Sequence, residues 1–499
     1  MNLLDAIIAP LSPAWALQRA RSRSALEAMR AYDGASRDRR TSGWRVSASG
    51  PVTEVRIGRQ MLRDRSRDLV RNNAWMDRAV AVKTSNLVGT GIRPRADSGN
   101  PDLNKRIDDV FARWAEHCAP ESGEDFYSMQ ALAVRSRIES GENIVLLDRT
   151  GGTLSGGVPM ALQVLEPDWI ADYADGNTES RDGWADGIRF TKDGRRAAYR
   201  IWNANPNETG VVSRRDYRTV PAADVIHLFR LLRPGQIRGV PDVASTLLRL
   251  RDLDDYHDAA LMLAKVQAIL GVFVTQPSGP GQSPIGAEGT DAAGNRTEDL
   301  SPGMVAYLPP GMEPHFLTPG KNEQFGEYTR TTLHMIAAGL GMTYHQLTGD
   351  LADANYSSLR AGSLEFRRHC EQEQWLLLVP RLCRPIWDAF IAQAILSGRL
   401  PAAAAGASAI WTPPRFEMID PNRDTEAMKS AVRAGFMTWP QAVSEQGEDP
   451  ATQLASIAEW NAKLKAAGVV LDIDPRLTTG NGGAVNPAAT ASTVLNATA

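Results

Sequence analysis

Two stretches of this chain are longer than ordinary globular helices, and they constrain the fold more than any other feature. Residues 241–270 carry apolar side chains near helical spacing, at Val243, Leu247, Leu250, Leu253, Ala260 and Leu263. A helix of about 30 residues is roughly 45 Å long, whereas the mean α-helix has about 11–12 residues. Residues 357–396 form a second long pattern, which contains Pro380 and Pro385. Proline removes a backbone donor and clashes with the preceding turn, so we expect a kink there.

Shorter elements of both kinds surround these helices and indicate an α+β fold. Helical patterns cover residues 60–88, 104–117, 128–140 and 324–339, and Gly141 is expected to stop the third of them. Short β-like runs separated by Gly, Asp and Asn fill residues 143–229: NIVLLD, ALQVLE, GIRF, AYRIW and VIHLF. Residues 276–300 are rich in Gly, Pro and Ala and predict an irregular insertion, with strands resuming at MVAYL and PHFL.

The C-terminal part predicts three more helices. Asp420 is placed to cap a helix that begins with Pro421 and closes at Gly435. Two further helices are expected over residues 440–446 and 450–467. The Ala, Thr, Asn and Gly of residues 477–499 predict a disordered tail.

The N-terminal region is strongly basic although the chain as a whole is not. Residues 1–78 hold 15 Arg, no Lys and 8 acids, a net charge of +7, whereas the whole chain carries −3. Residues 19–45 show little periodicity, so they predict either a mobile basic arm or a solvated linker. The first 17 residues lack a basic leader region and favour an amphipathic helix over a signal peptide. No apolar run approaches the roughly 20 residues that span a bilayer.

The catalytic and metal-binding motifs that this sequence offers favour no enzyme class. Gly320-Lys321 is followed by Asn322 and lacks the preceding glycine of a phosphate-binding loop. The 7 histidines are scattered, and no G-x-S-x-G elbow is present. Three cysteines, an odd number without a disulfide-like spacing, indicate synthesis in a reducing compartment. The sequence therefore predicts no catalytic residues, no metal and no cofactor.

Five segments, taken in order, resemble lambda-type tailed-bacteriophage portal proteins. They are RDRSRDLVRNNAWMDRAVAVKTSNLVGTGI (63–92), RPGQIRGVPD (233–242), LSPGMVAYLPPGMEPHFLTP (300–319), IAAGLGMTYHQLTGDLADANYSSLRAGSLEFRR (336–368) and RFEMIDPNRDTEAMKSAVRAGFMTWPQAVSEQGEDP (415–450). Together they span about residues 60–460. The Gly/Pro-rich residues 278–300 depart from the compact clip of that family, so contacts of the clip are the part that transfers least.

The resemblance implies an α+β portal fold assembled as a ring, typically of twelve subunits. The implied parts are a basic N-terminal arm (1–59), a wing (60–240), a first stem helix (241–270), a clip (271–318), a second stem helix (319–345), a tunnel loop (346–358), a long kinked helix returning to the wing (359–420), a crown-like helical region (421–470) and a tail (471–499). A stem helix in a ring buries its apolar face against the neighbouring subunit, which accounts for the unusual helix lengths.

The same resemblance implies which residues meet DNA and which partners the ring has. The tunnel loop contributes Asp350, Asp353, Asn355, Tyr356, Ser357 and Ser358, and Arg360 lies just beyond it. We expect a serine, Ser357 or Ser358, to cap the next helix, and Arg360 to pair with an acid of a neighbouring loop or to contact the DNA backbone. The arm contributes Arg19, Arg21, Arg23, Arg37, Arg39 and Arg40, which could contact scaffold, capsid shell or DNA.

The implied role is a DNA channel at one capsid vertex, used for packaging, head-tail joining and ejection. Expected partners are further copies of the chain, the terminase large subunit, a head-tail connector, capsid and scaffold proteins and double-stranded DNA, with no membrane. The protein is expected in the virion after synthesis in the host cytoplasm. Two alternatives stay open: a nucleic-acid enzyme, which would need a phosphate loop or clustered carboxylates, and a capsid or scaffold protein without a channel. The tunnel loop could likewise be an ordinary helix-helix turn.

Overall fold

A computed structural model describes residues 48–149, 157–172, 183–208, 216–269, 325–352, 354–416 and 420–469, four short strands between 272 and 308, and positions 15, 18, 39 and 43. The chain divides into two compact units, Met1–Glu54 and Val55–Ala499. Except for the first residues of α3, the elements described below belong to the second unit. The predicted strand PHFL, the predicted tail and most of the predicted arm lie outside the described residues.

The helical pattern at residues 60–88 forms two helices instead of one, α3 (Pro51–Asn72) and α4 (Ala74–Leu87). Asn73 between them has extended backbone, and its side chain accepts a hydrogen bond from the Met76 amide. This N-cap satisfies an amide that the first turn of α4 leaves without a helical partner. The apolar periodicity continues across Asn73, which is why the pattern predicted a single helix. Helix α3 also begins inside the range expected of the arm.

Helices α5 (Pro101–Ala115) and α6 (Phe126–Ser140) confirm the next two patterns. Gly141 ends α6 in the left-handed region, with φ 90°. A side chain at this position would bring its Cβ within 2.4 Å of the Val240 carbonyl carbon. Glycine therefore permits both the helix end and the close approach of the chain around Val240.

Most of the strands form small antiparallel sheets. In the first, β2 (Glu142–Asp148) pairs on one side with β3 (Ala161–Leu165) and on the other with β8 (Val225–Phe229). The second has the order β4-β5-β6-β7, with strands Trp184–Ala185, Ile188–Phe190, Arg196–Trp202 and Tyr217–Pro221. Two more antiparallel pairs are β1 (Arg93–Asp97) with β13 (Ser408–Thr412) and β10 (Glu288–Thr290) with β11 (Arg296–Glu298). Short 3-10 turns cover Pro167–Trp169, Ala222–Asp224 and Ala402–Ala404.

An aromatic cluster joins α5, α6 and a later helix, α11 (Arg384–Leu396), in the largest hydrophobic core. Phe111 lies within 5.5 Å, centroid to centroid, of four other rings: Trp114, Phe126, Trp387 and Phe390. The two indoles keep hydrogen-bond partners inside this core, because Trp114 donates to the Met160 carbonyl and Trp387 donates to the Ala407 carbonyl. These buried aromatics fix α11 to the body of the second unit.

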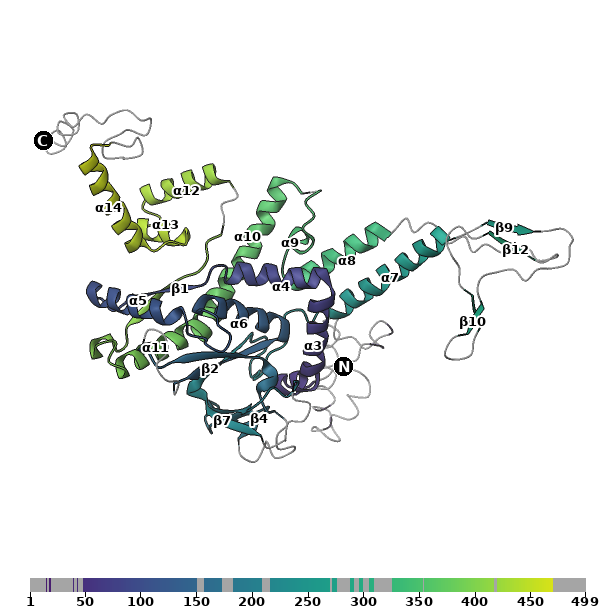
Figure 1. The fold of residues 1–499 in the computed structure, drawn as a ribbon, viewed down its shortest axis with the longest axis horizontal. Helices are drawn as coiled ribbons and strands as arrows, with labels where there is room; N and C mark the ends of the chain where they lie inside the picture. The colour runs from purple at the N-terminus through teal and green to yellow at the C-terminus, as the bar shows by residue number, and fades with distance from the viewer. Residues whose placement is uncertain are drawn as a thin grey trace. The chain divides into compact units, whose positions relative to one another are not determined.

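The two stem helices of the prediction correspond to α7 (Leu247–Ile269) and α8 (Phe325–Leu340), which lie side by side (Figure 1). Between them in sequence, β9 (Val272–Thr275) and β12 (Val305–Leu308) pair in parallel. A one-turn helix, α9 (Tyr344–Thr348), follows α8 where only a loop was expected. Its capping box, Thr343 with Gln346, satisfies both amides at its start.

The long pattern at residues 357–396 is continuous but changes its hydrogen bonding midway. Helix α10 (Tyr356–Glu373) passes into a π-helix, Gln374–Cys383, and then into α11. Pro380 lies inside the π-helix. The wider π turn accommodates a residue that lacks an amide hydrogen, so the irregularity expected at the prolines is a change of helix type.

The C-terminal helices are α12 (Pro421–Arg433), α13 (Trp439–Glu445) and α14 (Pro450–Ala467), as the pattern predicted. Asp420 caps α12, and Gly435 follows its end with φ 76°. Helices α12 and α14 hold no buried residue, and α13 holds one, Ala442. Among the described residues, no helix combines the length and apolarity needed to span a bilayer.

Candidate tunnel segment and its supporting network

The stem hairpin, defined here as α7 and α8, is held together by polar and aromatic contacts between the middle of α7 and the start of α8. His257 Nε2 lies 3.0 Å from the Thr329 hydroxyl, and the rings of Tyr256 and Phe325 stack 5.6 Å apart. On its outside the hairpin exposes large apolar side chains: Leu248, Leu261, Met262, Tyr328 and Met335. Leu248 is 70% exposed and Met262 61% exposed. The hairpin therefore offers apolar surface that this chain leaves uncovered within its described residues.

The tunnel segment, residues 346–358, runs from α9 to the first turn of α10. Gly349 lets the chain leave α9 in the left-handed region, with φ 75°. The exposed Asp350 side chain accepts a hydrogen bond from the Ala352 amide at 3.0 Å, which shapes the turn. Leu351 is 60% exposed. Asp353 lies outside the described residues, and so does the side chain of Tyr356.

Two of the roles expected in this segment are corrected by the structure. The cap of α10 is Asn355, whose side-chain oxygen accepts from the Ser358 amide at 2.8 Å. Ser357 and Ser358 instead lie inside the first helical turn, because the helix begins at Tyr356. Arg360 forms an ion pair at 3.1 Å with Asp424 of α12 in the same chain. An acid of a neighbouring loop or the DNA backbone was the expected contact, and the sequence separation of 64 residues hid this partner.

Other contacts anchor the segment to the body. Arg78 of α4 donates to the Gln346 carbonyl at 3.0 Å, and the rings of Tyr344 and His334 stack 4.3 Å apart. Of the six arginines expected to act in the arm, Arg39 alone lies within the described residues. The structure thus brings together the acid Asp350, the cap Asn355 and the exposed Ser357 and Ser358 on one segment, and it ties the start of α10 to α12.

A ladder of ion pairs along α3 was not predicted. Four arginines spaced over one face of the helix contact four acids of the chain between residues 166 and 186. The contacts are Arg56 with Asp186, Arg59 with Asp172 and Asp186, Arg63 with Asp168, and Arg67 with Glu166 and Asp168. Their spacing, at intervals of three, four and four residues, is the signal in the sequence. These four arginines of α3 therefore bind α3 to that segment and are not part of a free basic surface.

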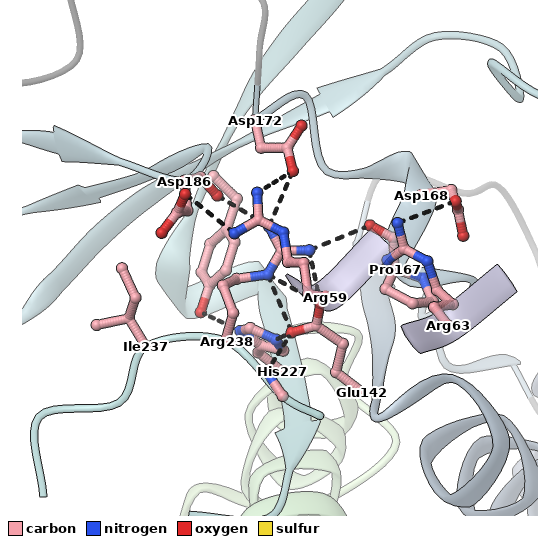
Figure 2. A network of polar contacts seen from close by, with 12 residues as sticks. Arg59, Arg63, Glu142, Pro167, Asp168, Asp172, Asp186, His227, Ile237 and Arg238 are labelled. Atoms are coloured by element: carbon pink, nitrogen blue, oxygen red, sulfur yellow. Dashed lines mark hydrogen bonds and ion pairs between the residues drawn. The ribbon is translucent and has the colours of Figure 1, made fainter. Parts of the chain in front are cut away.

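Beneath this ladder, Glu142 is the centre of a buried network (Figure 2). Its carboxylate accepts from Arg238 at 2.6 Å, from the Gly239 amide at 2.8 Å and lies 2.8 Å from His227 Nε2. Burial works to raise the pKa of Glu142, but the charge of Arg238 and the hydrogen bond to His227 outweigh it and hold that pKa well below its ordinary value. The carboxylate is therefore ionised.

The contact between Glu142 and His227 resembles a catalytic dyad, but its geometry indicates a structural role. The second ring nitrogen of His227, Nδ1, lies 3.1 Å from Arg196 Nη1 and accepts from it when the ring is neutral. Burial lowers the pKa of His227 to about 4, although the hydrogen bond to Glu142 opposes this. Both ring nitrogens are thus engaged inside the protein. Elsewhere in the described part of the chain, no three His, Cys, Asp or Glu side chains are placed to bind a metal ion.

Buried neutral His227 should make stability fall in mild acid. An unfolded histidine titrates near pH 6.5, whereas the folded pKa is about 4. Below pH 6.5 the unfolded chain binds a proton that the folded chain does not, so this contribution is complete above pH 6.5 and is lost as pH falls toward 4. Between pH 7 and pH 5 we expect a loss of about 2 kcal/mol. Urea unfolding at both pH values should show a smaller loss for His227→Gln, and an equal loss would contradict this assignment.

Comparison with known proteins identifies the class of protein to which these features belong. The sequence pattern of the family described as phage portal protein, lambda family, matches residues 37–374. A probable portal protein of Halomonas phage phiHAP-1 is 23% identical over 432 residues, 82% of each chain. The portal protein of Escherichia phage N15 is 23% identical over 460 residues, 81% of this chain and 84% of the relative. Portal protein B of Escherichia phage lambda is 21% identical over 276 residues, covering 50% of this chain and 52% of its own.

Solved structures from gene transfer agent (GTA) particles align over a similar span. A chain from the neck of an empty particle aligns with 81% of this chain and 100% of its own length, at 15% identity and a TM-score of 0.43. A chain from the neck of a native particle aligns with 82% of this chain and 98% of its own, at 17% identity and a TM-score of 0.39.

The family match covers most of the chain and therefore defines a structural component of a phage capsid. The chain belongs to the lambda family of phage portal proteins, as its five sequence segments predicted. It is a portal protein, a part of the virion at the capsid vertex through which the genome is packaged and released.

Proposed function

We propose that this portal protein closes into a ring of twelve copies, and that DNA passes through the centre of the ring. The observation that carries the proposal is the stem hairpin, which exposes Leu248, Leu261, Met262, Tyr328 and Met335 along its outside. Exposed apolar patches of this kind mark contact surfaces. A repeated head-to-tail contact generates a closed ring when the rotation per subunit closes. A neighbouring hairpin is the proposed cover.

The tunnel segment is proposed to face the DNA, with Asp350 and Asp353 nearest the phosphates and with Asn355, Tyr356, Ser357, Ser358 and Arg360 beside them. DNA must slide, and a basic lining would hold it by releasing counterions from the phosphates. The exposed carboxylate of Asp350 and the exposed hydroxyls of Ser357 and Ser358 support passage without tight binding. The net charge of −3 per chain supports the same property, because a ring of twelve would carry about −36.

The remaining parts of the proposal concern partners and activity. The terminase large subunit is proposed to dock at the clip, residues 271–318, and to supply all ATP hydrolysis, while the portal itself is not an enzyme. A head-tail connector, capsid and scaffold proteins are the other proposed partners. Synthesis is proposed in the host cytoplasm. The division into arm, wing, stem, clip, tunnel loop and crown keeps the boundaries stated above.

Light scattering of the purified chain tests the ring. We expect a particle several times heavier than the 54.3 kDa chain. Leu261→Glu combined with Met262→Glu should return it to monomers, because carboxylates would be buried without partners at every contact. Leu396→Glu is the control, since Leu396 is 79% exposed on α11, outside the hairpin. A wild-type chain that stays monomeric at micromolar concentration would contradict the proposal.

The basic N-terminal arm can be tested by removing its positive charges. Replacing Arg19, Arg21, Arg23, Arg37, Arg39 and Arg40 with Gln removes six positive charges from a region proposed to contact scaffold, capsid shell or DNA. Ring formation should be unchanged, while incorporation into procapsids or the yield of packaged DNA should fall. If packaging is untouched, the arm is a solvated linker. Counting packaged particles by their protected DNA supplies the measurement.

A further inference from the structure

A buried arginine lies where two functional parts of the chain meet. Arg137 of α6 has no exposed side-chain surface. Its Nη1 contacts both carboxylate oxygens of Asp242, at 2.9 and 3.0 Å, and its Nη2 contacts the Glu373 carboxylate. Lys83 of α4 adds a second cation to Asp242 at 3.0 Å. One guanidinium thus bridges two acids that are separated by 131 residues of sequence.

The first acid belongs to the root of the stem hairpin. Asp242 comes five residues before α7 begins at Leu247. Its amide donates to the Ile138 carbonyl at 3.1 Å, so both its backbone and its side chain are held by α6. Burial works to raise the pKa of Asp242, but Arg137 and Lys83 outweigh it and bring that pKa to about 2. Asp242 therefore stays ionised, and the root of the hairpin stays attached to α6.

The second acid belongs to the helix that leaves the tunnel segment. Glu373 is the last residue of α10, whose first turn contains Ser357 and Ser358. The π-helix begins at the next residue, Gln374, which is buried and donates to the Leu87 carbonyl at 2.9 Å. Ten residues of π-helix then separate α10 from α11, which the aromatic core holds. A π-helix is a rare form that often marks functional positions.

The cost of breaking these buried ion pairs favours a movement of α10 and the stem root together. Separating Glu373 from Arg137 removes one of the two acids from a guanidinium that has no exposed surface, so it costs more than breaking an exposed ion pair. A groove of about 590 Å³ lies beside this junction, and its lining includes the exposed Leu231, Leu232 and Leu376. Space is therefore available for the end of α10 to shift, provided that the ion pairs shift with it.

We infer that Arg137 is a positioning residue that couples the tunnel segment to the stem hairpin: a displacement of α10 by DNA reaches the root of α7 through Glu373, Arg137 and Asp242. This inference rests on the proposed function, because it takes the tunnel segment as the part that DNA displaces. It adds a specific route by which a displacement in the channel is passed to the stem and, through the stem, to the clip.

Hydrogen exchange of the full-length assembled protein tests the coupling. Glu373→Gln keeps an acceptor but removes the charge, and it should speed amide exchange at the root of α7, residues 242–250, by about tenfold. Glu371→Gln is the matched control, because Glu371 is exposed on the same helix. It should leave residues 242–250 unchanged. Faster exchange confined to α10 in Glu373→Gln would overturn the inference.

A second variant separates coupling from simple local damage. Lysine at position 137 can reach one acid but cannot bridge two, so Arg137→Lys should itself speed exchange at residues 242–250. In that background Glu373→Gln should add no further effect there, whereas independent sites would add. Additive effects would contradict the bridge. Images of the same samples reveal whether rings form, so failure of the ring and failure of the coupling are distinguishable.

Discussion

Glu142→Gln should destabilise the wing region more than any single surface change does. We expect the free energy of unfolding to fall by roughly 3–5 kcal/mol. The variant leaves the buried Arg238 guanidinium without its countercharge, and it weakens the contacts to His227 and the Gly239 amide. Truncating one partner of a buried pair costs more than the pair contributed, because the other charge stays out of water. Urea unfolding at pH 7 supplies the measurement.

The control for this experiment is an exposed ion pair in the same chain. Arg251 and Asp255 on α7 lie 3.0 Å apart, with side chains 67% and 58% exposed. Asp255→Asn should change stability by no more than about 0.5 kcal/mol, because solvent screens such pairs. If Glu142→Gln were as mild as Asp255→Asn, the buried network would not be the element that holds β2, β8 and the approach to the stem together.

Changing Asp350 and Asp353 together to Lys should leave rings intact but block normal passage of DNA. In a ring of twelve, about 24 carboxylates would become ammonium groups that bind phosphate and release counterions. DNA should be packaged slowly or retained at ejection. Packaged DNA per particle and the fraction ejected on triggering, at two salt concentrations, are the quantities to measure. High salt should partly restore passage, since it weakens phosphate contacts.

A charge-matched control separates position from net charge. Glu116→Lys with Asp193→Lys makes the same change in net charge at two exposed positions outside the tunnel segment. That variant should package and eject like the wild type. Normal packaging and ejection by the Asp350 and Asp353 variant would mean that residues 346–358 are an ordinary helix-helix turn with no role in passage.

Local signals in the sequence predicted most of the helices. Gly141, Asp420, Pro421 and Gly435 act through their own backbone preferences, so the ends of α6 and α12 could be predicted from them. The break at Asn73 was missed, because an asparagine in a helical pattern does not interrupt its apolar spacing. The prolines predicted an irregularity, but whether it becomes a kink or a π-helix depends on packing around Gln374–Cys383.

The ion pairs could not be predicted, because their partners are distant in sequence. Arg63 and Asp168 are 105 residues apart, and only the folded chain brings α3 against that segment. The arginine spacing on α3 indicated a common face but not what covers it. In the tunnel segment the acidic composition was visible, while the partner of Arg360 is set by a tertiary contact with Asp424 of α12. The cap of α10 is a local contact between Asn355 and the Ser358 amide, which the expectation of a serine cap missed.

Electron micrographs of the purified, negatively stained protein test the central claim most directly. The claim is that copies of this chain close into a ring around a DNA channel. The expected images show closed rings with a central hole. Particles taken from capsids should have twelve subunits in the ring. Solid or open assemblies without a hole would fit a capsid or scaffold protein and would contradict the account.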